Sequence, residues 1–152
     1  SSVTGVQTCA LPIYVRVGFS PDYRECQKAS PVFGGIAKAG ILKLGTWGTQ
    51  VHPDIAPKDG DFDIVKHRVS PFYSTNLDAI LRANGITRIY CSGVSTNAVC
   101  QATIREGHDR DYQMVLLEDC CSASSEEEHA NAANGMKRFC TEFTTSADVK
   151  FA

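Results

Sequence analysis

The sequence predicts an α/β fold of three layers, in which helices cover both faces of a mainly parallel sheet. The first observation is that strand-like and helix-like segments alternate from residue 61 onward. A strand followed by a helix and then by another strand of the same sheet makes a right-handed crossover between parallel neighbours. The second is that the chain has 152 residues, 43% of them hydrophobic and 21% charged, which is typical of one globular domain.

The first half of the chain is predicted to hold two strands joined by long connections. Residues 14–18 (YVRVG) alternate and are rich in strand-forming side chains, and residues 61–66 (DFDIVK) form a second short strand. Between them, residues 19–31 are polar with two prolines, which indicates a loop. Residues 32–40 are rich in glycine and alanine and only weakly helical, and residues 41–60 form an irregular connection.

Three helical patterns and three strands alternate in the second half. The strands are predicted at residues 86–92, 112–118 and 140–144. The strand at residues 112–118 is apolar enough to be buried on both faces of the sheet. The helices are predicted at residues 75–84, 96–108 and 125–139. Gly85 is typical of a helix end, and Ser125 with Glu128 forms a capping box at the start of the last helix.

The composition excludes several classes of protein. A formal charge of −2 provides no basic surface for nucleic acid, and the apolar runs are too short to cross a bilayer. The seven cysteines are odd in number and lack a C-x-x-C spacing, and the four histidines are scattered. This pattern indicates neither a disulfide framework nor a metal site. We therefore expect a cytoplasmic protein with no metal and no cofactor.

The opening residues do not fit the rest of the chain. Residues 3–13 (VTGVQTCALPI) show no periodicity and no targeting signal, and they match one reading frame of a common sequencing adapter. We interpret residues 1–13 as an adapter artefact. Residues 14–152 are then expected to form a single domain whose natural sequence continues upstream of Tyr14.

The run GVSTNAVC, residues 93–100, is the strongest candidate for chemistry. It follows a predicted strand and opens a predicted helix, at the sheet edge where parallel α/β proteins bind ligands. Backbone N–H groups at a helix start are unpaired and carry the positive end of the dipole, so they favour a thiolate or an oxyanion. Cys100 is therefore a candidate nucleophile. The alternative is that it packs beneath the helix.

Two basic residues, Lys66 and Arg68, lie at the carboxyl end of the strand predicted at residues 61–66. Lys66 ends the strand at residues 61–66, at the same edge of the sheet. A lysine beside a thiolate lowers the pKa of the thiol and can give a proton to a leaving group. Arg68 is a candidate for binding a substrate carbonyl or carboxylate. The alternative for both residues is an ordinary cation in water.

Further residues stand at a spacing typical of one enzyme family. The pattern combines Lys66 at a strand end with the run from Gly93 to Asn97 and with polar and apolar positions around them. Those positions are Ser70, Phe72, Thr75, Leu77, Leu81, Thr103, Asp111, Tyr112, Glu118 and Asp119. Residues 66–123 on this basis resemble the isochorismatase-like cysteine hydrolases, especially the ureidoacrylate and biuret amidohydrolase branch. Weaker similarity extends back to Tyr14.

The resemblance implies a Rossmann-like sheet and an Asp–Lys–Cys triad that hydrolyses a small amide or ureide through a covalent intermediate. Lys66 falls on the triad lysine. The bond between Val94 and Ser95 falls on the family's cis peptide, and the amides of Ser95 and Val99 fall on its oxyanion hole. Substrate contacts are expected from Arg68, Phe72, Thr96 and Asn97. Because the family is usually oligomeric, we expect a homo-oligomer.

Two departures leave catalysis open. The triad aspartate lies on the family's first strand, upstream of Tyr14, so we expect that strand and its helix to be missing and this fragment to be inactive. Alignment places Val99 at the nucleophile position, and neighbours on a helix are rotated by roughly 100°. Cys100 therefore does not point where the family thiol points unless the first turn is distorted.

Three hypotheses remain. The first is a hydrolase of a carbon–nitrogen bond in a small amide or ureide, with Lys66 and Cys100 as catalytic residues. The second is a hydrolase of the same fold without a thiol nucleophile, in which the aspartate does the acid–base work. The third is a non-catalytic ligand-binding or assembly domain. The sequence alone leaves open whether the chain is an enzyme.

Overall fold

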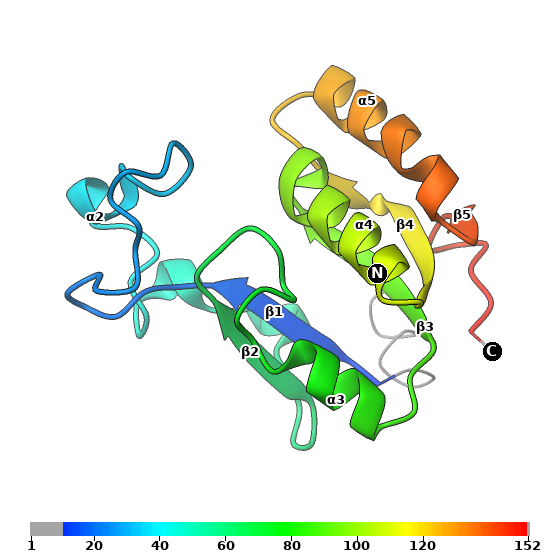
Figure 1. Cartoon of the computed structure of the whole chain (residues 1–152), viewed down its shortest axis with the longest axis horizontal. Helices are drawn as coiled ribbons and strands as arrows, with labels where there is room; N and C mark the ends of the chain where they lie inside the picture. Colours follow the sequence, from blue (N-terminus) through cyan, green and yellow to red (C-terminus); the bar gives the residue numbers. More distant parts are fainter. Residues whose placement is uncertain (1–10, 152) are drawn as a thin grey trace. The chain divides into compact units, whose positions relative to one another are not determined.

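The computed structural model describes residues 11–151, which form two compact units, residues 11–68 and residues 69–151. Helices and strands alternate along the chain (Figure 1), and every strand pair in the described residues is parallel. The predicted α/β class with parallel pairing is therefore confirmed. Most of the segment that we interpret as adapter, residues 1–10, lies outside the described range.

The unit of residues 11–68 is built on two parallel strands. β1 (Ile13–Val17) pairs with β2 (Phe62–Lys66), so that Val17 lies opposite Lys66. The weak helix predicted at residues 32–40 is only one turn, α2 (Ile36–Ala39), which ends at Gly40 with a φ of 66°. That left-handed conformation is easy only for glycine, so the helix stops there. Two short 3₁₀ turns, Trp47–Thr49 and Pro53–Ile55, fill the connection to β2.

An aromatic cluster fixes the carboxyl ends of these two strands. Phe19 follows β1 and is fully buried, with its ring 5.8 Å from that of Phe33 and 5.7 Å from that of His67. Gly18 donates a backbone hydrogen bond to the carbonyl of Lys66 at 3.1 Å. Because both strand ends are tied by backbone hydrogen bonds and covered by rings, the position of Lys66 in this unit is well defined.

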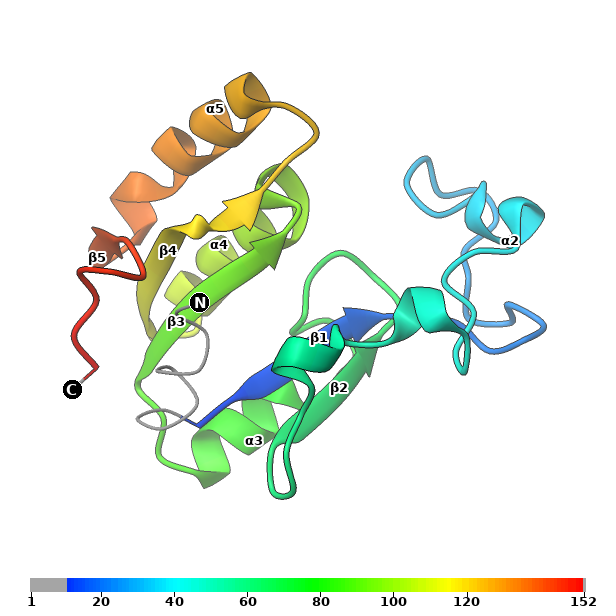
Figure 2. The same ribbon diagram turned by 180° about the vertical axis from the view of Figure 1, so that it is seen from behind.

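The second unit holds a three-stranded parallel sheet in the order β3-β4-β5. The strands are β3 (Arg88–Val94), β4 (Gln113–Ser122) and β5 (Glu142–Thr144). The helices are α3 (Leu77–Ala83), α4 (Gln101–Asp109) and α5 (Glu126–Met136). α4 and α5 lie side by side against one face of this sheet (Figures 1 and 2). Val115 and Leu116 of β4 are fully buried, as the apolar run predicts.

β4 is longer and less regular than its sequence predicts. Cys91 of β3 pairs with Leu116, whereas Gly93, two residues further along, pairs with Cys121. β4 therefore bulges between these pairs and resumes pairing up to Ser122, where the prediction ended the strand at residue 118. Such bulges re-aim the residues that follow them. Here the bulge brings Cys121 beside Gly93.

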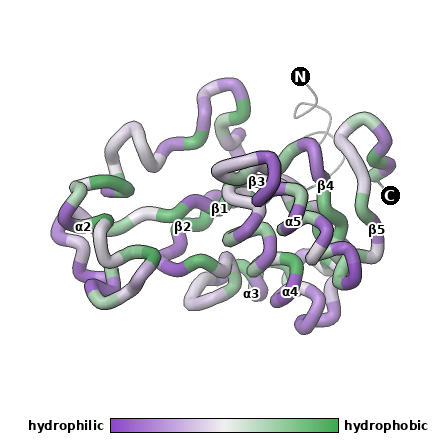
Figure 3. The backbone as a smooth tube through the Cα atoms, turned by 90° about the horizontal axis from the view of Figure 1, so that it is seen from above, coloured by the Kyte–Doolittle hydropathy of each residue, from purple (hydrophilic) through white to green (hydrophobic). Residues whose placement is uncertain are grey.

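The predicted helix ends in this unit agree with the structure. Gly85, with a φ of 64°, follows the end of α3. The Ser125 hydroxyl accepts a hydrogen bond from the Glu128 amide at 3.2 Å, so Ser125 caps the start of α5, as the sequence predicts. The backbone coloured by hydropathy in Figure 3 contrasts the apolar run of β4 with this acidic first turn. α5 ends at Met136 and continues as a 3₁₀ turn, Lys137–Phe139.

Two helical glycines provide a matched test of the packing between α4 and β4. A Cβ added at Gly107 of α4 lies 2.5 Å from Sδ of Met114, whose side chain is fully buried. A Cβ at Gly135 of α5 meets nothing closer than 3.8 Å. We expect Gly107→Ala to lower the free energy of unfolding by about 1–3 kcal/mol because the core is overpacked. Gly135→Ala should raise it by about 0.5–1 kcal/mol through helix propensity, as urea unfolding would measure.

If the two alanine variants change stability in the same direction and by the same amount, helix α4 does not pack against Met114 as closely as described.

Candidate active site

Lys66 is a buried lysine at the carboxyl end of β2. Its side chain is 6% exposed, and Nζ donates a hydrogen bond to the carbonyl of Arg68 at 2.7 Å. Burial disfavours the charged form and lowers the pKa of Lys66 to about 8. An amine with such a pKa exchanges protons readily near neutral pH, which suits a general acid or base.

The lowered pKa of Lys66 predicts how the free energy of unfolding depends on pH. The unfolded lysine keeps its ordinary pKa of about 10.5, so between about pH 8 and pH 10.5 the unfolded state binds more protons. The free energy of unfolding should therefore rise with pH through this window, by on the order of 3 kcal/mol for this group. Below about pH 8 the folded protein carries the cost of a buried cation.

Lys66→Met removes this term, and comparing the variant with the wild type at each pH cancels the titration of the cysteines. We expect the stability advantage of the variant to be larger at about pH 7 than at about pH 10 in urea unfolding. A difference between the two proteins that is the same at both pH values would contradict the lowered pKa.

Arg68 is engaged with backbone carbonyls of its own unit. Its Nη1 donates to the carbonyl of Glu25 at 2.9 Å and to that of His67 at 2.6 Å. These bonds tie the loop of residues 19–31 to the end of β2. The structure thus shows a positioning role for Arg68 within this unit, and substrate binding by Arg68 stays a prediction.

In the other unit, β3 runs directly into a distorted helix. The peptide bond between Val94 and Ser95, where the resemblance implies a cis bond, is cis. The next five residues, Thr96–Cys100, form a π-helical turn, in which the amides of Ala98 and Cys100 both donate to the Ser95 carbonyl at 3.2 and 3.3 Å. π-turns of this kind are rare and often mark functional sites. No side chain caps the helix start.

Val99 and Cys100 occupy the second half of this turn. Val99 is half-buried and offers no reactive atom. Cys100 is 1% exposed, and its Sγ lies 3.5 Å from the carbonyl oxygen of Gly93 and 3.8 Å from Sγ of Cys121. The thiol thus lies beneath the turn, between β3 and β4.

The surroundings of Cys100 keep its thiol protonated. A hydrogen bond with Cys121 lowers the pKa of Cys100, but the hydrogen bond with Cys91, burial and the Coulombic effect of Cys91 outweigh it and raise the pKa to about 12. The pKa of Cys121 is also raised, by its hydrogen bond with Cys100 and by burial. A thiol with such a pKa is a poor nucleophile at neutral pH.

The other predicted contact residues of this unit have partners of their own. Phe72 is 4% exposed and stacks on Tyr112 with ring centroids 6.2 Å apart. Thr96 is fully buried, with Oγ1 2.8 Å from Nδ1 of His129. Asn97 is exposed, and its Nδ2 lies 3.4 Å from a carboxylate oxygen of Glu128. Phe72 therefore belongs to the core, whereas Thr96 and Asn97 connect the turn to α5.

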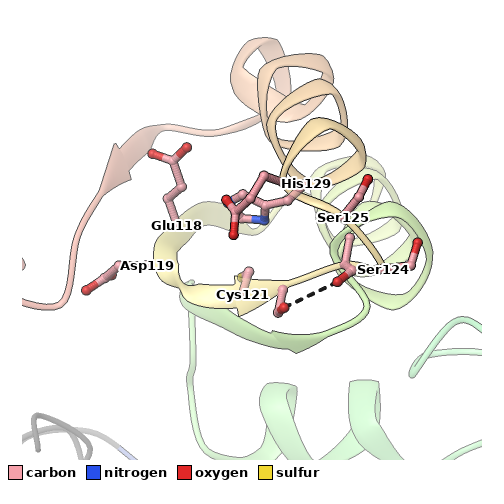
Figure 4. Close-up of a pocket in the computed structure, with 9 residues that line it drawn as sticks. Glu118, Asp119, Cys121, Ser124, Ser125 and His129 are labelled. Carbon is pink, nitrogen blue, oxygen red and sulfur yellow. Dashed lines mark hydrogen bonds between the residues drawn. The ribbon is translucent and has the colours of Figure 1, made fainter.

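A polar cavity of about 520 Å³ lies at the carboxyl end of β4 and the start of α5. Figure 4 shows Cys121 of β4 and His129 of α5 on facing sides of it. It is lined by Glu118, Asp119, Cys121, residues 122–124, Ser125, Glu126 and His129. None of the predicted site residues lines this cavity, and it carries more carboxylates than cations.

His129 lines this cavity and contacts Thr96, but it is not among the site residues that the sequence predicts. A signal was present, because the capping box at Ser125 and Glu128 starts a helix directly after a strand. This places the next residue, His129, near the carboxyl edge of the sheet. In residues 11–151, no group of three or more His, Cys, Asp or Glu side chains is arranged to hold a metal ion.

Parallel strands that alternate with helices define an α/β protein. Residues 12–148 match the isochorismatase domain family. The chain therefore belongs to the isochorismatase family, as the residue pattern predicts.

Known proteins support the same assignment. The chain is 38% identical over 125 residues to the uncharacterised isochorismatase family protein YecD of Escherichia coli O157:H7, covering 81% of this chain and 64% of that protein. The chain thus spans less than two thirds of the length of this relative. N-carbamoylsarcosine amidase from Thermoplasma acidophilum superposes with a TM-score of 0.77 at 28% identity, over 98% of this chain and 80% of that one. A cysteine hydrolase from Pseudomonas syringae pv. phaseolicola 1448A superposes with a TM-score of 0.83 at 25% identity, over 97% and 72%.

Proposed function

We propose that the protein hydrolyses a carbon–nitrogen bond in a small amide or ureide. The observation that carries the proposal is the turn at Val94–Ser95, where a strand ends and a helix opens without a side-chain cap. Backbone amides at such a helix start stabilise the negative charge that develops on a carbonyl oxygen during hydrolysis. The similarity to N-carbamoylsarcosine amidase, whose name describes a ureide substrate, supports the substrate class.

The proposed roles follow from the chemistry of each group. When a nucleophile adds to the substrate carbonyl, the amides of Ser95 and Val99 stabilise the oxyanion of the tetrahedral intermediate. The family resemblance assigns to Lys66, with its pKa of about 8, the role of giving a proton to the departing nitrogen, which leaves as an amine or ammonia. If a side chain is the nucleophile, a water then hydrolyses the acyl- or carbamoyl-enzyme; if water is the nucleophile, loss of the nitrogen gives the free acid or carbamate directly.

The identity of the nucleophile divides this proposal in two. In the first version the Cys100 thiol attacks the carbonyl and forms a thioester or thiocarbamate. In the second version a water attacks directly and gives its proton to the aspartate that the resemblance implies, and Cys100 is a packing residue. The burial of Cys100 and the raised pKa of its thiol favour the second version, because a protonated and inaccessible thiol does not attack.

Ammonia release from a panel of simple amides and N-carbamoyl amino acids tests the proposal, with the protein assayed in a form that includes the aspartate strand that the resemblance implies. We expect Cys100→Ser to keep kcat/KM within about threefold of the wild type if water attacks, and to lose at least about 100-fold if the thiol attacks. Cys140→Ser is the matched control, since Cys140 precedes β5 and so lies at the amino edge of the same parallel sheet. No release from any compound of the panel would contradict the proposed function itself.

The remaining expectations stay predictions. A homo-oligomer is checked by light scattering on the purified protein, and a cytoplasmic location by fractionation of the producing cells. Within the described residues, the structure contains no helix that is long and apolar enough to cross a membrane.

A further inference from the structure

A partly buried hydrogen bond joins Thr96 to His129, and neither residue has a role in the hydrolysis proposed above. Thr96 is the first residue after Ser95, and its side chain is among the few polar ones that are fully buried in the described part of the chain. A buried hydroxyl is costly unless it is hydrogen-bonded. The hydroxyl lies 2.8 Å from Nδ1 of His129, which satisfies it.

The partner histidine sits on a firmly anchored turn of α5. The Ser125 hydroxyl caps the amide of Glu128, and the Ser125 carbonyl accepts from the amide of His129 at 3.0 Å. Asn97 reaches the same turn through its 3.4 Å contact with Glu128. The first two residues of the π-turn are therefore both connected to a single capped turn of another helix.

The ring of His129 also forms part of the cavity wall at the end of β4 (Figure 4). The ring of His129 therefore contacts Thr96, next to the turn at Val94–Ser95, through Nδ1, and it also forms part of the wall of a polar cavity.

We propose that His129 is a positioning residue for the turn at Val94–Ser95: by holding the Thr96 hydroxyl it fixes the start of the helix and thereby the direction of the Ser95 amide. The inference rests on the proposed function for its kinetic consequence. The structural consequence, a turn that is less ordered without the contact, does not depend on it.

Two pairs of variants separate this contact from general effects on folding. Thr96→Val has nearly the same shape but no hydroxyl, whereas Thr96→Ser keeps the hydroxyl. In His129→Gln the side-chain amide lies one carbon further from the backbone than Nδ1 of the histidine. In His129→Asn the side-chain amide keeps a polar atom close to the position of Nδ1. His108→Gln, an exposed histidine at the end of α4, is the control for loss of an imidazole elsewhere.

We expect Thr96→Val and His129→Gln each to lower kcat for ureide hydrolysis at least about tenfold while KM changes less than about threefold. Thr96→Ser, His129→Asn and His108→Gln should stay within about threefold of the wild type. The double variant of Thr96→Val and His129→Gln should be no slower than either single one, because both break the same contact. Unchanged kcat in either single variant, or losses that multiply, would overturn the inference.

Amide hydrogen exchange across residues 92–100 provides a readout that needs no substrate. We expect exchange to quicken at least about tenfold in both Thr96→Val and His129→Gln, and to be unchanged in His108→Gln. If the wild type hydrolyses none of the panel compounds, the proposed function fails, yet the exchange result still decides the positioning role. Unaltered exchange in the two variants would refute it.

Discussion

Lys66→Met is expected to reduce kcat/KM for ureide or amide hydrolysis by about 10²–10⁴-fold, the usual contribution of a positioned general acid. The reason is that the side chain is 6% exposed and has a pKa of about 8, so the wild type can both hold and release a proton near neutral pH. Methionine has a similar length and fits a buried site, so the folded structure should persist. The measurement is steady-state ammonia release at about pH 7.5.

Two further lysine variants sharpen this test. Lys66→Arg keeps the positive charge but does not release its proton, so a loss close to that of the methionine variant would assign the effect to proton transfer. Lys58→Met, at an exposed position in the same unit, should leave activity unchanged. Activity of Lys66→Met within a few-fold of the wild type would remove Lys66 from the reaction.

Much of the fold was predictable because each element has a local signal. The apolar run of β4 indicates a strand buried on both faces, and Val115 and Leu116 are indeed fully buried. The start of α5 follows from the hydroxyl of Ser125, which accepts a hydrogen bond from the amide of Glu128, three residues further along the chain. Signals of this kind need no knowledge of distant contacts.

The bulge in β4 had no such signal. It is defined by which residues of β3 pair with which residues of β4, with Gly93 opposite Cys121. Pairing between residues far apart in sequence is not encoded in the periodicity of either strand. The apolar run by itself therefore predicts a strand that ends at residue 118, and it gives no indication of the contact between Cys100 and Cys121.

The candidate site was predictable in outline but not in its environment. Ser95 and Lys66 stand where the residue pattern places them, at the ends of β3 and β2. The burial of Cys100 and the rise of its pKa arise from Cys91 and Cys121, which belong to two different strands. A sequence shows that a thiol is near a helix start, but only packing shows whether that thiol is ionised.

The amide of Ser95 is the group on which the proposed function depends most directly, and two substitutions isolate it. Ser95→Pro removes the N–H, since proline has none, while Ser95→Ala removes only the hydroxyl. Loss of one donor to a developing oxyanion costs about 10²–10³-fold in kcat, whereas the alanine variant should remain within a few-fold of the wild type. Circular dichroism on both variants checks that the fold is retained.

The most direct measurement of the central claim is therefore kcat for ammonia release from a ureide by Ser95→Pro and Ser95→Ala side by side. The proposal that the turn at Val94–Ser95 stabilises the oxyanion predicts that the folded proline variant is at least about 100-fold slower than the alanine variant. Equal rates in the two folded proteins would contradict it.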